Sequence, residues 1–435
     1  MEARKLNHAI LGFYPGKAEA GKASWRKIIA AGFGVLGLAA STFAATPANP
    51  SASIEARQVL NYIYSIYGKQ MLTAQMDAPF GGKETEYIFS TTGKYEAIIG
   101  IDLINENQNN GEVTKAINYW KAGGLVTVMW HWGAPTVGEG YDASKGTVAN
   151  FNNLFVQGSN ENKEMMLDLD RIAGHLAKLR DAHVPVIFRP MHECSGGWFW
   201  WDKSGGAGFV KVWKFMFDYF TKTKGLDNLI WFLGYDGSPS VDYNPGAGYF
   251  DMVGADTYGP GGPYAAQFSG PKKIHGSEIP IALHECGVAP VPETNLAQNC
   301  MFAWFMVWHT SYIHNMNTTL LKSIYTSPLA ITRDKLPKDW SQYTSSIPIL
   351  QVSRNSNSGL RLVSDPQGFA FTTDLPGVNR VGIFSTDGRS QDWIPFRRGP
   401  GNFYSVELPL QSRGMRILKI QGAGKSQELP VLLGR

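Results

Sequence analysis

The chain reads Val184-Pro185-Val186-Ile187-Phe188-Arg189-Pro190-Met191-His192-Glu193 near its middle, an apolar run that passes directly into charge. Such a run is typical of a strand buried on both faces, as in a parallel sheet. A second run repeats the pattern, Ile279-Pro280-Ile281-Ala282-Leu283-His284-Glu285, and both are followed by cysteine. Because the ends of parallel strands meet at one edge, the repeat predicts that the two glutamates share a site.

Apolar runs recur between residues 55 and 330, and helical patterns separate them. Leucine, isoleucine and methionine at steps of three and four make 164–182 the clearest helix, and 207–222 also reads as one. The runs occupy 71–75, 97–102, 124–130, 184–190, 228–234, 250–255, 279–284 and 301–308. Eight strands alternating with helices predict an α/β fold, a (β/α)8 barrel. The alternative, a doubly wound sheet, is disfavoured because no Gly-rich phosphate loop opens the first crossover.

In a (β/α)8 barrel the site forms at the C-terminal ends of the strands. Counting places Glu193 after the fourth strand and Glu285 after the seventh. Other strands also end in polar or aromatic residues: His131, Asp256, Tyr258, Trp304 and Trp308. The carboxylates Glu106, Glu112 and Glu139 are assigned to polar loops between strands and are rejected as catalytic.

Two carboxylates at one site suggest the hydrolysis of glycosidic bonds, which uses one group to move a proton and another as nucleophile or base. The stretch Gly196-Gly197-Trp198-Phe199-Trp200-Trp201 follows Glu193 and offers flat indole faces on which a sugar ring can stack. The structural alternative is that Glu193 only pairs with Arg189. Period-2 alternation places residues 189 and 193 on the same side.

Residues 55–330 resemble glycoside hydrolase family 26, whose main members are endo-β-1,4-mannanases. The block Phe188–Glu193 and the run from Gly196 to Trp201 carry the likeness, and His284 departs from the family, which more often has Thr there. The resemblance implies a (β/α)8 barrel and a retaining double displacement on mannan, glucomannan or galactomannan, with Glu193 as acid/base and Glu285 as nucleophile. It implies no cofactor.

The resemblance also implies roles for seven further residues. His131, His192, Asp256 and Tyr258 would hydrogen-bond the substrate or orient the carboxylates, and Arg189 would favour an ionised Glu285. Trp198 and Trp308 would stack on sugar rings. The plainer alternatives are a packed strand histidine for His131 and His192, a barrel salt bridge for Arg189, and core packing for Trp308. The mechanism needs Glu285 ionised while Glu193 holds a proton.

Composition and charge limit the classes of molecule that the protein is expected to bind. The 435-residue chain has a net charge of only +4 and no basic tract, so nucleic acid is not expected. Cys194, Cys286 and Cys300 form an odd set, read as buried free thiols, and no metal-ligand spacing links Cys and His. The expected partner is a β-mannan polysaccharide, acted on by a monomer. A same-fold β-xylanase, a mixed-linkage β-glucanase and a non-catalytic carbohydrate-binding barrel remain alternatives.

Both ends of the chain differ from the barrel. Residues 1–45 contain an export-signal pattern, Arg26-Lys27 before a short apolar stretch, which predicts a secreted or surface protein of a bacterium with no membrane part when mature. The barrel is assigned to 46–340. Short strands and turns over 347–435 predict an antiparallel β module that resembles bacterial sorting domains. A carbohydrate-binding module and an inert appendage are its alternatives.

Overall fold

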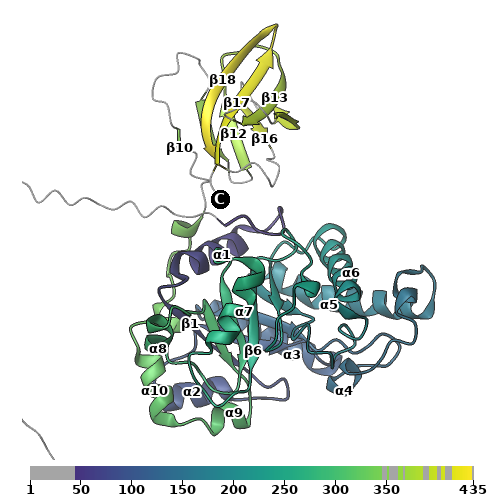
Figure 1. Ribbon diagram of the computed structural model, residues 1–435, viewed down its shortest axis with the longest axis vertical. Helices are drawn as coiled ribbons and strands as arrows, with labels where there is room; N and C mark the ends of the chain where they lie inside the picture. The colour runs from purple at the N-terminus through teal and green to yellow at the C-terminus, as the bar shows by residue number, and fades with distance from the viewer. Residues whose placement is uncertain are drawn as a thin grey trace, which may run out of the picture. The chain divides into compact units, whose positions relative to one another are not determined.

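The computed structural model describes residues 45–344, 350–351, 361–365, 368–385, 391–398, 403–406 and 414–433. Its first part is a closed barrel of parallel strands ringed by helices (Figure 1). The barrel strands are β1 Met71–Met76, β2 Ile98–Asp102, β3 Leu125–Trp130, β4 Val186–Pro190, β5 Leu229–Gly234, β6 Met252–Thr257, β7 Ile281–Cys286 and β8 Trp304–Val307. The predicted (β/α)8 fold is therefore confirmed.

Closure of the barrel excludes the doubly wound alternative. Strand β1 pairs in parallel with β2 on one side and with β8 on the other, where Leu72 lies opposite Trp304. A short strand, β9 Ala330–Ile331, adds to the start of β1. Nearly every residue of the eight strands is buried, which explains their uninterrupted apolar character.

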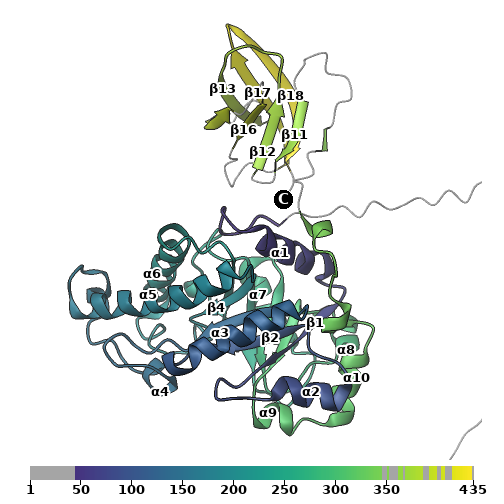
Figure 2. The same ribbon diagram turned by 180° about the vertical axis from the view of Figure 1, so that it is seen from behind.

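Helices follow the strands and cover the outside of the barrel (Figure 2). The helices are α1 Ile54–Ile66, α2 Glu84–Thr92, α3 Glu106–Lys121, α4 Tyr141–Ser144, α5 Asn160–Asp181, α6 Gly205–Asp218, α7 Ala265–His275, α8 Pro292–Ala297, α9 Ser311–His314 and α10 Thr318–Thr326. Short 3-10 or π turns are η1 Phe151–Phe155, η2 Tyr219–Thr223, η3 Val241–Tyr243, η4 Arg333–Lys335 and η5 Ser341–Tyr343.

Helix α5 begins earlier in the sequence than its apolar periodicity predicts. The helix begins four residues before the predicted 164, because the Ser159 hydroxyl accepts a hydrogen bond from the Asn162 amide at 3.1 Å and caps the first turn. Apolar periodicity starts only at Met165, so the pattern gave no sign of the polar first turn. None of the helices in the described ranges is both long and apolar enough to span a bilayer.

Helix α1 closes the N-terminal end of the barrel. Its apolar side chains Val59, Leu60 and Ile63 belong to one buried cluster with Leu72 and Met252, which lie near the starts of β1 and β6. An apolar cover at this end leaves the C-terminal ends of the strands as the open face of the barrel.

The C-terminal module is built from antiparallel strands. One sheet has the order β10-β18-β17-β13-β14 and the other β11-β12-β16-β15. The strands are β10 Leu350–Gln351, β11 Arg361–Asp365, β12 Gly368–Thr372, β13 Val378–Ser385, β14 Gln391–Ile394, β15 Phe396–Arg398, β16 Phe403–Val406, β17 Gly414–Gly422 and β18 Lys425–Leu433. The export-signal pattern lies outside the described residues, and so do Asp387-Gly388 and Gly399-Pro400-Gly401, whose sequences are typical of turns between strands.

One buried acid in the barrel wall opposes stability. Glu96, just before β2, is fully buried, accepts a hydrogen bond from the Thr85 hydroxyl at 2.7 Å, and its second oxygen finds no partner among the described residues. Burial raises the pKa of Glu96 from 4.5 to about 7. The folded state therefore favours the protonated acid. The protein loses stability as the pH rises from about 4.5, the ordinary pKa of the group, through about 7, its pKa in the folded protein.

We predict that Glu96→Gln raises the free energy of unfolding by about 2–3 kcal/mol at pH 8, because glutamine never ionises. At pH 4 the wild-type glutamate is already protonated, so the two proteins should unfold alike. Urea titrations at both pH values measure this. An equal gain at pH 4 and pH 8 would contradict the assignment.

Candidate active site

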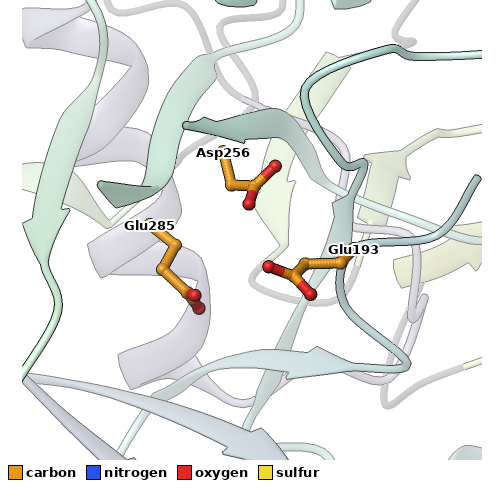
Figure 3. A group of neighbouring side chains, drawn as sticks. All are labelled: Glu193, Asp256 and Glu285. Carbon is orange, nitrogen blue, oxygen red and sulfur yellow. The ribbon is translucent and has the colours of Figure 1, made fainter. Parts of the chain in front are cut away.

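Three carboxyl groups meet at the open end of the barrel. Glu193 follows β4, Asp256 lies in β6 and Glu285 in β7, and the three point toward one another (Figure 3). One oxygen from each lies within 4.8 Å of the other two. Their exposed fractions are only 9%, 5% and 3%. The predicted convergence of Glu193 and Glu285 is thus observed, and oxygens within 4.8 Å are closer than the roughly 6.5–9.5 Å between the carboxyl groups of an inverting glycosidase.

A β-bulge directs Glu285 into the site. The register of β6 and β7 shifts so that Asp256 lies opposite Glu285, and β7 and β8 are irregular between Leu283 and Cys286. Bulges next to active sites re-aim side chains. Here the bulge lets two consecutive residues, His284 and Glu285, both reach groups at the centre of the barrel, which strict alternation would forbid.

Glu193 stands on a loop with unusual backbone geometry. Strand β4 ends at Pro190, and Met191, Glu193 and Ser195 all have positive φ angles of 49°, 52° and 80°. The alternation that was expected to place residues 189 and 193 on one side therefore stops at Pro190, and that part of the prediction is wrong. Arg189 donates to Thr127 and His284 instead, and the Glu193 carboxylate accepts from Trp198, so the simple ion-pair alternative fails.

Arg189 lies buried beneath the carboxyl groups. Its guanidinium donates to the Thr127 hydroxyl at 3.1 Å and to the His284 carbonyl at 3.0 Å, and it contacts His284 Nδ1 at 3.1 Å. Burial lowers the pKa of Arg189 to about 10, and Glu285 is the strongest opposing influence. Arg189 therefore stays charged at neutral pH and favours an ionised Glu285, as predicted.

Two histidines at the ends of β3 and β4 differ in charge. Burial disfavours the charged form of His131, but Asp102 at the end of β2 outweighs it, because its carboxylate contacts His131 Nδ1, and the pKa of His131 is raised. Burial and the neighbouring His131 and Arg189 lower the pKa of His192 well below its usual value. The ring centroids lie 4.6 Å apart. One histidine can thus carry charge while the other stays neutral beside it.

The groups around Glu285 shift its pKa in opposite directions. Burial and the nearby Glu193 raise its pKa to about 8, while Arg189, the Tyr258 hydroxyl and His131 favour its ionised form. Tyr258 donates a hydrogen bond to Glu285 Oε1. The ionised state expected of Glu285 therefore depends on whether its neighbour Glu193 carries a charge.

Like charges at this distance cannot all ionise, so the carboxyl cluster shares protons. Burial, and then the charge of Glu193, raise the pKa of Asp256 well above its usual value, and a hydrogen bond joins Asp256 to Glu193. When a proton resides on Glu193, the repulsion on Glu285 disappears and its three favourable neighbours can stabilise the carboxylate. That arrangement, protonated Glu193 beside ionised Glu285, is the one that double displacement needs.

The predicted sugar-stacking residues take different positions. The Trp198 indole N–H donates to Glu193 Oε2 at 2.7 Å, and 40% of the residue remains exposed. Trp308 follows the end of β8, is half-buried, and lies 6.2 Å from the His131 ring. Trp200 and Trp201 are buried core residues that donate to backbone carbonyls. Trp198 and Trp308 therefore keep the surface that a sugar would need, and stacking by either stays a prediction.

Other predictions have clear outcomes. All three cysteines are buried free thiols, as expected. Glu106 and Glu112 lie on helix α3 rather than in loops, so their placement was wrong, while Glu139 does lie in a loop. Within the described part, Glu193, Asp256 and Glu285 are the carboxylates that could together hold a cation. The prediction that no metal takes part in the reaction stays a prediction.

Sequence reasoning missed two supporting residues. Asp102 ends β2 and holds His131 through both its backbone amide and its ring, and the strand-end rule could have found it. His284 was treated only as a departure from the family. It is fully buried, contacts Arg189, and its Nε2 bonds the Tyr235 carbonyl at 2.8 Å, so it braces the arginine beneath the carboxylates.

Fold and site together define a (β/α)8-barrel protein of the type that hydrolyses glycosidic bonds with two carboxylates. Comparison with known proteins gives the family. The model of glycosyl hydrolase family 26 matches residues 48–335, and the chain belongs to this family.

Related proteins share the barrel. A mannan endo-1,4-β-mannosidase of Thermothelomyces thermophilus is 34% identical over 311 residues, which cover 66% of this chain and 62% of that protein. A crystal structure of a Podospora anserina β-(1,4)-mannanase superposes with a TM-score of 0.62 at 30% identity, covering 69% of this chain and 70% of that one. A β-mannanase from a symbiotic protist of the termite Reticulitermes speratus, complexed with a gluco-manno-oligosaccharide, gives 0.61 at 29% identity, covering 67% and 97%. The chain spans about half to two-thirds of the curated relatives it matches.

We predict that Tyr258→Phe lowers kcat about 10- to 100-fold, because a hydrogen bond to a charged group contributes about 1.5–3 kcal/mol. In the wild type, kcat/KM should fall above about pH 8, because the carboxyl cluster then loses the proton that it shares and no general acid remains. Loss of the Tyr258 hydroxyl should move this basic limb of the pH profile to higher pH. Steady-state rates across pH 5–10 measure both effects.

Tyr312→Phe is the matched control. Tyr312 lies on α9, and its ring centroid is 4.9 Å from that of Tyr258. The substitution removes a hydroxyl from the neighbouring exposed ring, and its profile should match the wild type. An unchanged kcat and basic limb in Tyr258→Phe would contradict the role of this hydroxyl.

Proposed function

We propose that this protein is a retaining endo-β-1,4-mannanase that hydrolyses internal bonds of mannan, glucomannan or galactomannan. The observation that carries the proposal is the buried pair Glu193 and Glu285, with oxygens within 4.8 Å across the open end of a family 26 barrel. That spacing leaves room for a sugar carbon but not for a water molecule placed between base and substrate, which supports retention rather than inversion.

The first half of the reaction forms a bond to the protein. Ionised Glu285 attacks the anomeric carbon, the glycosidic C–O bond breaks, and Glu193 gives its proton to the leaving oxygen. Tyr258 releases or shares its hydrogen bond as the Glu285 oxygen becomes an ester. In the second half, Glu193 takes a proton from water, the water oxygen attacks the same carbon, and Glu285 leaves as a carboxylate.

The substrate class rests on the relatives rather than on the carboxylates. The mannan endo-1,4-β-mannosidases and β-mannanases to which the chain is similar share its barrel and its family. A β-xylanase or mixed-linkage β-glucanase would use the same pair of carboxylates. Reducing-sugar release from mannan, xylan and barley-type glucan separates them, and activity on the last two without mannan would overturn the mannanase proposal.

We also propose that the protein is exported by a bacterium, acts as a monomer, and carries a C-terminal module with a sorting role. The export-signal pattern over residues 25–45 and the antiparallel sheets that follow the barrel support this. A carbohydrate-binding role for the module would instead give polysaccharide affinity to the isolated C-terminal strands.

We predict that Glu193→Gln and Glu285→Gln each lower kcat on mannan by at least about 10³-fold while polysaccharide binding persists, because glutamine keeps the shape but supplies neither acid nor nucleophile. NMR of the wild-type reaction should show the β-anomer first. Addition of a chelator should leave the rate unchanged.

Glu161→Gln is the matched control, since Glu161 on α5 has the same 9% exposure as Glu193 and bonds only Asn153 in the described part of the chain. It should keep the wild-type rate. Either active-site variant retaining near wild-type turnover, or the α-anomer appearing first, would refute the proposed mechanism. Binding without turnover in the wild type would favour a carbohydrate-binding protein instead.

We predict that the exported protein lacks the first 40–45 residues, because small residues at 41–45 follow the apolar stretch. Intact-mass measurement of protein from the medium or the cell surface tests this. The same spectrum shows whether residues beyond about 345 are removed, as a sorting role implies. A full-length mass in the cytoplasm alone would contradict export.

A further inference from the structure

A buried carboxyl group lies behind the loop that carries Glu193. Asp202 is 3% exposed, and its two oxygens accept hydrogen bonds from the backbone amides of Ser195 at 3.4 Å and Gly197 at 3.3 Å. Its own backbone is fixed as well, because the Gly205 amide donates to the Asp202 carbonyl at 2.8 Å. Asp202 does not reach the cleft, and the proposed reaction assigns it no role.

The loop needs such support because its backbone is strained. Met191, Glu193 and Ser195 adopt the left-handed conformation, which costs side-chain-bearing residues on the order of 1 kcal/mol each. Bonds to β5 hold the loop on one side, from the Cys194 amide to the Gly234 carbonyl at 3.0 Å. Asp202 holds the other side, on both flanks of Gly196.

The part that Asp202 holds is the seat of the Trp198 ring. A side chain added at Gly196 would place its Cβ 2.4 Å from Trp198 Cη2 and 2.7 Å from Cε2, so the indole lies directly against the Gly196 backbone. The same ring donates its N–H to Glu193 Oε2 at 2.7 Å. A continuous set of contacts therefore runs from Asp202 through the two amides, Gly196 and Trp198 to Glu193.

We propose that Asp202 is a positioning residue for Glu193, acting through the amides of Ser195 and Gly197 and the indole of Trp198. It fixes the height and tilt of the ring, and the ring fixes which oxygen of Glu193 faces the substrate. The same N–H also favours the ionised form of the carboxyl cluster, because a hydrogen-bond donor stabilises a carboxylate more than a carboxylic acid. This inference rests on the proposed glycosidase function.

The acceptor oxygens of Asp202, rather than its charge, perform this role. Burial raises the pKa of Asp202 to about 8, against the two amide hydrogen bonds, and its titratable neighbours are Asp236 and Glu193. Burial therefore disfavours the charge of Asp202, whereas the two amides favour it. Asparagine has the same shape, but its NH2 group would face a backbone N–H where an oxygen now accepts.

The test is Asp202→Asn in the full-length protein, assayed on mannan across pH 5–10. We expect kcat to fall about 5- to 20-fold with KM changed less than about twofold, because a misplaced catalytic group slows the chemical step more than binding. The basic limb of kcat should move to higher pH, because the carboxyl cluster then loses a hydrogen-bond donor that favours its ionised form.

Trp198→Phe tests the route. It removes the N–H donor, should shift the basic limb in the same direction, and the double variant should be no slower than Trp198→Phe alone. If the two substitutions lower kcat by factors that multiply in the double variant, Asp202 does not act through Trp198. Asp251→Asn is the matched control, because buried Asp251 likewise accepts two backbone amides, from Ala48 at 2.6 Å and Trp231 at 2.7 Å, at the N-terminal end of β6.

Asp251→Asn should lower the melting temperature and leave the pH profile of kcat in place. A wild-type kcat and basic limb in Asp202→Asn would overturn the proposal, whereas inactivity of the wild type on every polysaccharide would overturn the function first. If Asp202→Asn does not fold, Gly196→Ala replaces it. That change leaves the core intact, pushes the indole off its seat, and should give the same loss of kcat and the same shift.

Discussion

Repulsion between buried carboxyl groups is the constraint on which this site depends. Two charges about 5 Å apart interact by roughly 3 kcal/mol at an effective dielectric constant near 20, and burial adds a further cost to each. Three such groups, nearly excluded from water and within 4.8 Å, cannot all be ionised at neutral pH. The site therefore keeps a proton that no isolated surface glutamate would hold. A shared proton between two glutamates is also what a general acid beside a nucleophile requires.

The fold supplies the force that holds these groups together. Closure of β1 on β8 fixes the spacing of the strand ends, and α1 closes the opposite end with apolar side chains. The bulge at Glu285 turns it inward, and Arg189 beneath it supplies a buried positive charge braced by His284. The cost of crowding the carboxyl groups is thus offset by packing and charge elsewhere in the barrel, as is common at functional sites.

What could be predicted from sequence followed from periodicity. Buried parallel strands are apolar throughout, so each bound of the observed barrel strands falls within three residues of its expected position, and the strand-end rule located Glu193, Glu285 and His131. The rest depended on irregular backbone, which leaves no periodic signal. The left-handed residues after Pro190 ended the alternation assumed for Arg189 and Glu193, and the bulge at His284 hid its contact with Arg189. The polar run starting α3 read as a loop because its buried residues are polar or sparse.

The two glutamates are held in opposite ways, and the difference accounts for their roles. Glu285 lies within a strand, fully enclosed, with Arg189, Tyr258 and His131 all favouring its negative charge once Glu193 is protonated. Glu193 stands on a strained loop at the rim, with one indole donor and no cation paired to it among the described residues. In the proposed reaction, the group that passes a proton to the leaving oxygen and takes one from water must exchange with solvent, and Glu193 is the one of the two that stands on the loop. The rigid, cation-backed position suits the group that must form and break a covalent bond without moving. The loop position suits the group that must exchange protons with solvent, provided that something behind the loop holds it still.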